Sequence, residues 1–294
     1  MRPPLALPDW LAAALAAEMG SGRCEPSAVA ATADAAGSGP ARRLHRFDPA
    51  RQCAPTLPGF TGVRVYPDAL SRAEVEALLT TIEALPFKPS QSGKQKQHFG
   101  PRVNYLRRRI NADRFAGLPV YARGLEQRLR DRVGDDGAGD PVDLARCRAA
   151  LAAFETTDVF VLRYVAAEQS NLDFHVDDLY AYGEAIVDVS LESDSTLTFL
   201  GPCGDDRPEA EQQGIRVPLP ARSLAVVYGP ARVAWQHAIL SADVRSIRTS
   251  ITLRTLAPAL RSTETGRRVL ARIRGGADGE APDGASAPPR RKPG

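Results

Sequence analysis

Six short strand-like segments follow one another in the second half of the chain, and they limit the possible folds more than any other feature. Each is rich in β-branched and aliphatic residues, and the turns between them carry Gly, Pro, Asp and Ser, a pattern typical of strands joined by short turns. A series of this kind predicts an antiparallel sheet in two layers, arranged like a jelly roll. The segments are Val159–Val165, Ala185–Leu191, Ser195–Leu200, Ile215–Leu219, Ser223–Tyr228 and Ser246–Leu256.

Helical patterns precede these strands. After a strand-like run at Gly59–Tyr66, Ser71 and Glu74 have the spacing of a capping box, which predicts the start of a helix. Further helices are expected at 120–133 and from Pro141 onward. The predicted fold class is therefore α+β, with a jelly-roll core buttressed by N-terminal helices. The apolar residues at helical spacing in the first helix are Val75, Leu78, Leu79, Ile82 and Leu85.

The two ends of the chain differ from the middle in composition. Residues 1 to about 40 are rich in Ala, Gly, Ser and Pro, so we assign 1–56 to a largely disordered N-terminal extension, with a short helical pattern at 9–19. Residues 275–294 contain no aliphatic residue larger than Ala and no aromatic residue. We therefore predict a disordered basic tail over 263–294 and one domain over 57–262.

Composition excludes some classes of protein and leaves others open. No apolar run approaches the roughly 20 residues of a membrane-spanning helix, which excludes a membrane-embedded protein. The four cysteines form no C-x-x-C pair, so neither a zinc knuckle nor a redox dithiol is indicated. We expect reduced thiols, a monomer, and a location in the cytoplasm and nucleus. The net charge of +3 does not by itself indicate a partner.

His175 and Asp177 form the sharpest local motif of the chain. In an extended segment, residues two apart point to the same face, so this imidazole and this carboxylate can face one point. His237, much farther along, is the candidate third ligand. Two histidines and one carboxylate make the facial triad of non-haem Fe(II) oxygenases, although an H-x-D motif with a distant His also arises by chance.

Arginines alternate with smaller polar residues along the last predicted strand. Arg248 and Arg254 share one face of this strand with Ser250 and Thr252, while Ile251 lies on the other face. An arginine that points into a sheet core needs an anion, and a guanidinium grips a carboxylate with two hydrogen bonds. A dicarboxylate such as 2-oxoglutarate would fit them. The alternative is that this face is the solvent side of an edge strand.

In their order along the chain, the H-x-D motif, the distal His and the R-x5-R strand resemble the AlkB-type 2-oxoglutarate- and Fe(II)-dependent dioxygenases. The resemblance covers roughly 57–257 and is greatest to the homologue-four branch of that family. The segments that carry it are Ser90–Tyr105, His175–Asp178, Pro218–Leu224 and Trp235–Ile239.

The resemblance implies a double-stranded β-helix with His175, Asp177 and His237 as ligands of Fe(II), and with 2-oxoglutarate and O2 as co-substrates. It also implies oxidative N-demethylation, in which an N-methyl group is hydroxylated and formaldehyde, succinate and CO2 are released. The implied substrates are methyl-lysine in a protein such as actin and N6-methyladenine in DNA.

The resemblance further implies roles for three residues around 2-oxoglutarate. It places Arg248 at the far carboxylate, Arg254 near the keto-acid end, and Tyr164 as a hydrogen-bonding partner. This chain departs from many relatives at Leu162, where they have an Asn. The cysteine-rich N-terminal cluster of the animal members is also missing from this sequence.

Residues 84–112 contain no Asp or Glu but seven Lys or Arg, with aromatic residues between them. Basic side chains follow phosphates and aromatic rings stack on bases, so this segment is a candidate substrate lid; an acidic protein surface would also suit it. The alternative is a solvated flexible loop. The candidate substrate contacts are Lys94, Lys96, His98, Phe99, Arg102 and Tyr105.

Two further classes of protein stay open beside the enzyme. One is a catalytically silent fold of the same kind that binds nucleic acid or an acidic protein as a scaffold. The other is a nucleic-acid-binding protein in which the His and Asp residues are incidental. An intact triad together with both arginines favours the enzyme over the scaffold.

Overall fold

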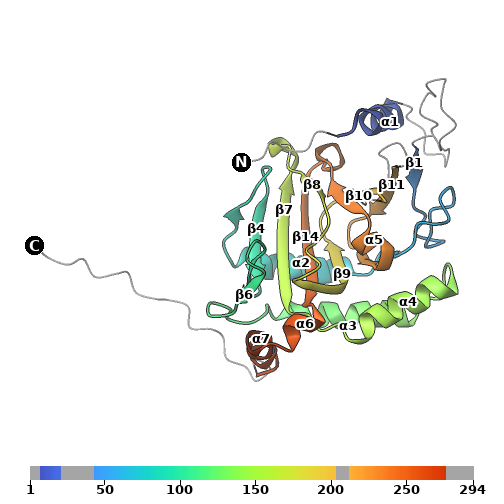
Figure 1. Cartoon of the computed structure of the whole chain (residues 1–294). Coiled ribbons are helices and arrows are strands. Elements are labelled where there is room, and N and C mark those ends of the chain that lie inside the picture. The colour runs from blue at the N-terminus through green and yellow to red at the C-terminus, as the bar shows by residue number, and fades with distance from the viewer. Residues whose placement is uncertain (1–6, 21–42, 203–211, 276–294) are drawn as a thin grey trace, which may run out of the picture.

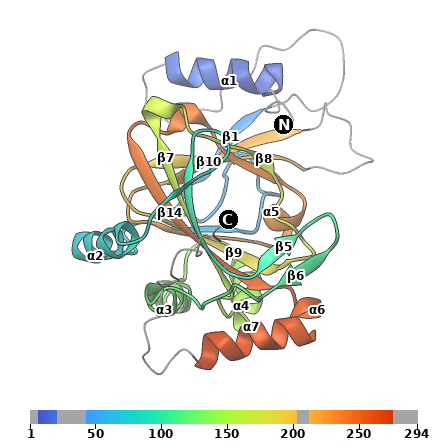
Figure 2. The same cartoon turned by 90° about the vertical axis from the view of Figure 1, so that its left-hand side faces the viewer.

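Two β-sheets packed face to face form the core of the computed structural model, which describes residues 7–20, 43–202 and 212–275 (Figures 1 and 2). The larger sheet has the strand order β2 (Val63–Tyr66), β12 (Leu224–Tyr228), β9 (Tyr182–Ser190), β14 (Ile247–Leu256), β7 (Asp158–Val165), β4 (Gln95–Phe99), β3 (Lys88–Pro89). The smaller sheet has the order β1 (Leu44–Arg46), β11 (Gln213–Leu219), β10 (Ser195–Gly201), β13 (Gln236–Ile239), β8 (Leu172–His175).

All six predicted strands are present, as β7, β9, β10, β11, β12 and β14. They pair antiparallel with one another, whereas β1 pairs with β11 in parallel. The mixed fold with a jelly-roll core is thus confirmed. The sequence did not indicate β8 and β13, which have four residues each and lie next to each other in the smaller sheet.

The central strands of the larger sheet are buried on both faces, because helices cover one side and the smaller sheet covers the other. Along β7, Val159 and Val161 pack in the cluster beneath the helices, and Leu162 and Tyr164 in the cluster between the two sheets. Strand β12 is buried at every position, which explains its continuous apolar run.

Helices α2 (Arg72–Glu83), α3 (Tyr121–Gly134) and α4 (Pro141–Ala152) contribute their apolar sides to the cluster on the outer face of the larger sheet. The predicted capping box is present: the Glu74 N–H donates to Ser71 Oγ at 3.2 Å, and the Ser71 N–H donates to Glu74 Oε2 at 2.7 Å. Asp140 caps α4 in front of its first-turn proline. No helix in the described part of the chain combines the length and the apolar composition needed to cross a membrane.

Helix α1 (Asp9–Gly20) corrects the prediction that 1–56 is largely disordered. Leu11 and Ala14 of this helix are buried against the outer face of the smaller sheet, and strand β1 adds an edge to that sheet. The helical pattern at 9–19 is therefore confirmed, and disorder is wrong for α1 and β1. Residues 1–6 and 21–42 lie outside the described chain.

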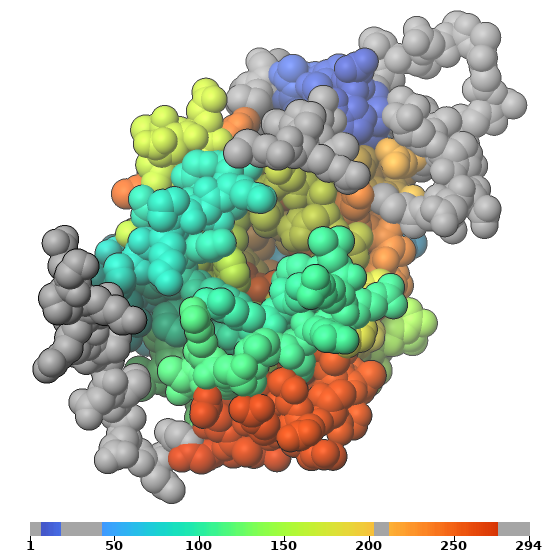
Figure 3. All heavy atoms as spheres, turned by 60° about the vertical axis from the view of Figure 1, so that its left-hand side comes forward, coloured from blue at the N-terminus to red at the C-terminus, as the bar shows by residue number. Residues whose placement is uncertain are grey.

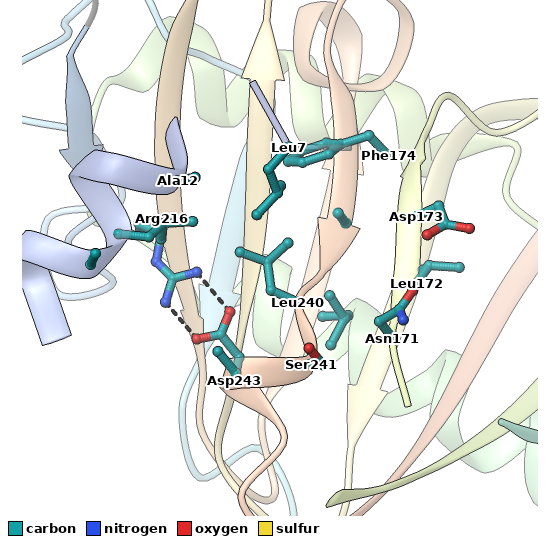
Figure 4. Close-up of a pocket in the computed structure, with 15 residues that line it drawn as sticks. Leu7, Ala12, Asn171, Leu172, Asp173, Phe174, Arg216, Leu240, Ser241 and Asp243 are labelled. Carbon is teal, nitrogen blue, oxygen red and sulfur yellow. Dashed lines mark hydrogen bonds and ion pairs between the residues drawn. The ribbon is translucent and has the colours of Figure 1, made fainter. Parts of the chain in front are cut away.

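A pocket of about 390 Å³ lies between α1 and the smaller sheet (Figure 4). Its walls are mostly apolar, and Arg216 forms two hydrogen bonds with Asp243 at one side (Nη1–Oδ2 2.6 Å, Nη2–Oδ1 2.5 Å). Phe174 and Ala238 face this pocket from β8 and β13. Because side chains alternate along a strand, the next residues, His175 and His237, point to the space between the sheets.

Helix α7 (Glu264–Gly275) corrects the predicted tail over 263–294. Helix α6 (Pro258–Arg261) precedes it, and Val269, Leu270 and Ile273 of α7 are buried. These three apolar residues share one face among exposed arginines, so α7 has a face that can pack despite its basic composition. Disorder is therefore wrong for 264–275, and 276–294 lie outside the described chain.

The remaining elements are short. Strands β5 (Arg102–Asn104) and β6 (Arg109–Asn111) form a separate hairpin within the basic segment, and α7 packs beside β6. Helix α5 (Gly229–Val233) joins β12 to β13, and 3-10 turns lie at Ala166–Glu168 and Ser241–Asp243.

The docking of α7 leads to a stability prediction at Gly266. A Cβ at this position would lie 1.9 Å from the Leu260 carbonyl oxygen, so Gly266→Ala should separate α7 from α6 and lower the free energy of unfolding by about 1–3 kcal/mol. Gly124→Ala in α3 is the control, since nothing lies within 4 Å of its Cβ position and alanine favours the helix. Urea denaturation of both variants would measure this, and equal stability would contradict the close approach.

Candidate functional site

The pairing of β8 with β13 brings the first two candidate ligands together. His237 lies directly opposite His175 in this antiparallel pair, and their ring centroids are 4.4 Å apart. Asp177 follows β8 and completes the group: one ligand atom from each of the three side chains lies within 4.8 Å of those of the other two. The structure therefore assembles the triad that the sequence predicted from widely separated residues.

The hydrogen bond of His175 determines which ring nitrogen is free. Its Nδ1 lies 2.9 Å from the Asp173 backbone oxygen. A carbonyl oxygen can only accept, so Nδ1 carries the proton and Nε2 keeps its lone pair, as in many metal-binding histidines.

The electrostatics of the triad suit a divalent cation. Burial alone would raise the pKa of Asp177, but Arg254 and the two histidines lower it to about 2. Burial, together with His175, lowers the pKa of His237 to about 3. A charged carboxylate beside a neutral imidazole is the state in which these groups bind metals. With two nitrogen donors and one oxygen donor, the set fits Fe(II).

Arg232 holds the backbone next to Asp177, and the sequence did not indicate it. The side chain is fully buried in α5 and donates from Nη1 to the Asp177 backbone oxygen at 2.6 Å and from Nη2 to the Asp178 oxygen at 3.2 Å. The loop that presents Asp177 is thus fixed from α5, whose short sequence gave no signal of a functional role.

A cavity of about 230 Å³ between the two sheets joins the triad to the polar face of β14. It is lined by all six residues predicted to bind iron or 2-oxoglutarate, namely Tyr164, His175, Asp177, His237, Arg248 and Arg254. In the space-filling view, the surface is hollowed between the turquoise β4 and the green hairpin β5–β6 (Figure 3). The polar face of β14 therefore points into the molecule, and the solvent-facing alternative is wrong.

Arg248 is buried at the deep end of this cavity and already has a carboxylate partner. Its Nη2 donates to Asp188 Oδ2 at 2.8 Å and to Ser190 Oγ at 2.9 Å, and its guanidinium lies 5.2 Å from the centroid of the Tyr164 ring. Burial raises the pKa of Asp188 despite the arginine. A lone charged residue within the apolar run of β9 is the signal that could have revealed Asp188.

Tyr164 and Leu162 add a hydroxyl group and an apolar side chain to the deep end of the cavity. Burial raises the pKa of Tyr164, so its hydroxyl is neutral and able to donate a hydrogen bond to an anion. Leu162 also lines the cavity and presents an apolar side chain where many relatives have Asn.

Arg254 lies at the triad end. Its Nη1 donates to Asp177 Oδ1 at 3.1 Å, its Nε donates to Asp158 Oδ1 at 2.9 Å, and its guanidinium stacks 4.1 Å from the centroid of the Tyr182 ring. The sequence did not indicate Asp158 and Tyr182. The role of Arg254 beside the keto-acid end of 2-oxoglutarate stays a prediction.

The candidate lid residues are dispersed, and only Tyr105 among them lines the cavity. Lys94 is buried and donates to the Asn171 backbone oxygen, so its prediction as a substrate contact is wrong. Phe99 packs against the core cluster, while His98 Nε2 hydrogen-bonds Asp158 Oδ2 at 2.5 Å. Lys96 and Arg102 are exposed, and their roles stay predictions. The segment forms strands β3 to β6, which differs from the flexible-loop alternative.

With this geometry in place, comparison with known proteins identifies the class of protein. The model of the 2OG-Fe(II) oxygenase superfamily matches residues 62–268, most of the chain, so this chain belongs to that superfamily. Its members are oxidoreductases that use Fe(II), 2-oxoglutarate and O2.

Within the superfamily the chain is of the AlkB type. It is 29% identical over 238 residues to the human alpha-ketoglutarate-dependent dioxygenase alkB homolog 4, a match that covers 72% of this chain and 74% of the relative. It is 26% identical over 196 residues to the DNA N6-methyl adenine demethylase of Caenorhabditis elegans, covering 67% of this chain and 60% of that protein.

Removal of the predicted carboxylate ligand should abolish both metal binding and turnover. We expect Asp177→Ala to lower Fe(II) affinity at least about 100-fold, because a facial triad has no spare protein ligand. The measurements are anaerobic Fe(II) titration and succinate formation from 2-oxoglutarate. Asp173→Ala is the control, since the hydrogen bond of His175 is to the backbone oxygen of Asp173, which alanine keeps. Unchanged Fe(II) affinity in Asp177→Ala would show that the triad is not the metal site.

Arg248→Lys should raise the KM for 2-oxoglutarate about 10-fold or more and leave Fe(II) affinity unchanged. Lysine keeps the charge but loses the planar group that binds Asp188, Ser190 and an incoming carboxylate together. Steady-state kinetics with varied 2-oxoglutarate measures the effect. The matched control is Arg163→Lys on β7, whose arginine pairs with Glu83 outside the cavity. A wild-type KM would assign the co-substrate carboxylate to another residue.

Proposed function

We propose that this chain removes the methyl group of N6-methyladenine in DNA by oxidative N-demethylation. Demethylation by an AlkB-type oxygenase is what the family supports, and the choice of DNA rests on the surface around the cavity opening. The worm relative, named a DNA N6-methyl adenine demethylase, adds support for this substrate.

The observation that carries the proposal is a basic surface beside the cavity. Tyr105 lines the cavity from the end of β5, and the hairpin around it has exposed Arg102, Arg107 and Arg109. In Figure 3 this hairpin lies directly above α7, which adds exposed Arg267. Exposed cations beside an aromatic ring suit a phosphate backbone with a base turned toward the cavity.

The protein's own residues supply binding, orientation and exclusion of water. His175 Nε2, Asp177 Oδ2 and an imidazole nitrogen of His237 would hold Fe(II), and Arg248 with Tyr164 would hold a carboxylate of 2-oxoglutarate. When bound, Fe(II) and 2-oxoglutarate supply the oxidation of the N-methyl group with O2.

Apolar side chains enclose this chemistry. Ile186, Leu197 and Leu219 line the cavity from three different strands, so they keep bulk water away from the reacting methyl group. Hydroxylation of that methyl group would produce a hemiaminal, which breaks down to the free amine and formaldehyde.

Methyl-lysine in a protein such as actin is the second candidate substrate. The basic hairpin supports it as well, because an acidic protein surface is complementary to the same arginines. The predicted monomeric state and the predicted location in the cytoplasm and nucleus stay part of this proposal.

A formaldehyde-release assay compares the two substrates. We expect release from N6-methyladenine DNA that depends on added Fe(II) and 2-oxoglutarate and is absent in Asp177→Ala. A mono-methyl-lysine actin peptide is the alternative substrate. Formaldehyde release from this peptide alone would mean that the substrate is a protein and not DNA. Negligible release from both would reject both candidates.

Charge reversal of the basic surface should weaken use of DNA selectively. We expect the double variant Arg107→Glu, Arg109→Glu to raise the KM for methylated DNA at least about 10-fold and to reduce its dependence on salt, because phosphate contacts are lost. Succinate formation without DNA should be unchanged.

Arg146→Glu, compared with the single variant Arg107→Glu, is the control for where the charge is reversed. Arg146 is exposed on α4, which packs on the outer face of the larger sheet, on the side of that sheet away from the cavity. An equal rise in KM in this control would mean that overall charge, rather than the hairpin, determines DNA use.

A further inference from the structure

A series of hydrogen-bonded polar side chains leads from the candidate lid to the metal triad. On β4, His98 Nε2 lies 2.5 Å from Asp158 Oδ2 of β7. Asp158 Oδ1 accepts from Arg254 of β14, which in turn donates to Asp177. Four residues from four segments thus form one connected series, and the functional roles assigned so far do not explain its first two members.

The larger sheet fixes the order of this series. Strands β4, β7 and β14 are neighbours in the sheet, with His98 opposite Phe160 and Arg254 opposite Asp158 in the pairing. Asp158 is completely buried, and both of its oxygens have cationic or histidine partners. Although burial raises the pKa of Asp158, Arg254 and His98 outweigh this and hold that pKa below its ordinary value.

Gly100 leaves room for the pair of His98 and Asp158. A Cβ at Gly100 would lie 2.2 Å from Asp158 Oδ2 and 3.0 Å from His98 Nε2, closer than atoms approach without displacement. The segment Gln97–Gly100 therefore has a glycine at the point where the imidazole meets the carboxylate. The contact between His98 and Asp158 therefore depends on Gly100, because any larger residue there would push the two side chains apart.

The far end of the series determines how Asp177 is presented. Arg254 engages Asp177 Oδ1 at 3.1 Å, while Oδ2 lies 3.5 Å from His237 Nε2. One oxygen is therefore held by the arginine, and the other faces the histidines. If Arg254 turned away from Asp158, it would lose the partner that holds its Nε and would no longer be fixed against Asp177.

We propose that His98 and Asp158 are positioning residues that hold Arg254 against Asp177, so that a single carboxylate oxygen is presented to the metal. Residues that hydrogen-bond to a metal ligand strongly affect the affinity for the metal. Arg254 is such a residue for Asp177, and Asp158 and His98 lie behind Arg254. The proposal rests on the metal triad and is independent of which methylated substrate the enzyme uses.

The basic hairpin reaches the same arginine by a second route. Tyr105 Oη lies 3.3 Å from Tyr182 Oη, and the Tyr182 ring lies against the Arg254 guanidinium. The contact of His98 with Asp158 and the contact of Tyr105 with Tyr182 thus both lead to Arg254. The position of the lid is thereby linked to the presentation of Asp177.

Metal affinity measured without any methylated substrate tests the proposal. Mn(II) replaces Fe(II) to avoid oxidation, and free Mn(II) is followed by electron paramagnetic resonance. We expect His98→Ala and His98→Asn to raise the Kd for Mn(II) about 5–10-fold, near the lower limit for outer partners of metal ligands. His98→Gln should stay within about 2-fold of wild type, because the glutamine amide nitrogen reaches the position of Nε2 and donates to Asp158, whereas the asparagine amide is too short.

A buried histidine outside the series provides the control. His45 Nε2 donates to Gln213 Oε1 at 3.0 Å, and its Nδ1 lies 2.8 Å from Thr56 Oγ1. We expect His45→Ala to lose stability while keeping the wild-type Kd for Mn(II). A wild-type Kd in His98→Asn, or an equal increase in His98→Asn and His98→Gln, would overturn the proposal. Because His98→Asn and His98→Gln are both polar and differ in reach, their comparison stays decisive even if His98→Ala does not fold.

Discussion

Charge compensation inside the cavity is the constraint on which the rest of the structure depends. Asp177, Asp188, Arg248 and Arg254 line the cavity between the two sheets, and the buried Asp158 pairs with Arg254. An isolated buried charge would be too costly to keep, so each of these groups requires the others. Arg232 adds a third buried guanidinium next to Asp177. Of the three carboxylates, Asp177 is the one that faces the histidines, with Oδ2 3.5 Å from His237 Nε2, so its oxygen is directed at the place where a cation would bind.

The sequence predicted the metal-binding and co-substrate-binding residues of this cavity better than the strands and carboxylates that hold them in place. The H-x-D motif and the arginine face were visible because their spacing is short and their residue types are unusual within strands, and His237 followed as a distant third ligand from among the four histidines of the chain. Strands β8 and β13 were missed because four residues carry too little periodicity, and their pairing is a long-range contact. Asp158 and Asp188 were missed for a related reason. Asp158 begins the apolar strand β7 and Asp188 lies within β9, and each pairs with an arginine on another strand, β14.

The prediction of disorder at the two ends of the chain was wrong for a different reason. Composition suggested disorder, but α1 and α7 each need only a few apolar residues to dock. In α1 these are Leu11 and Ala14; in α7 they are Val269 and Ile273, which lie between arginines. Average composition does not register such a narrow face, because packing depends on where the apolar residues stand along the helix. Lys94 is the converse case: its charge suggested exposure, yet its stem is buried and its ammonium group finds a backbone oxygen.

The pairing of Arg248 with Asp188 shows how the deep end of the cavity differs from the triad end. At the triad end, arginine and histidines stabilise the charge of Asp177 and lower its pKa. At the deep end, burial prevails over Arg248 and raises the pKa of Asp188, so Asp188 is the carboxylate of the two that more readily takes up a proton. A carboxylate that enters beside Arg248 must share this guanidinium with Asp188. With Leu162 on the same wall providing no hydrogen bond, the grip on a dicarboxylate depends on Arg248, Tyr164 and the protonation of Asp188.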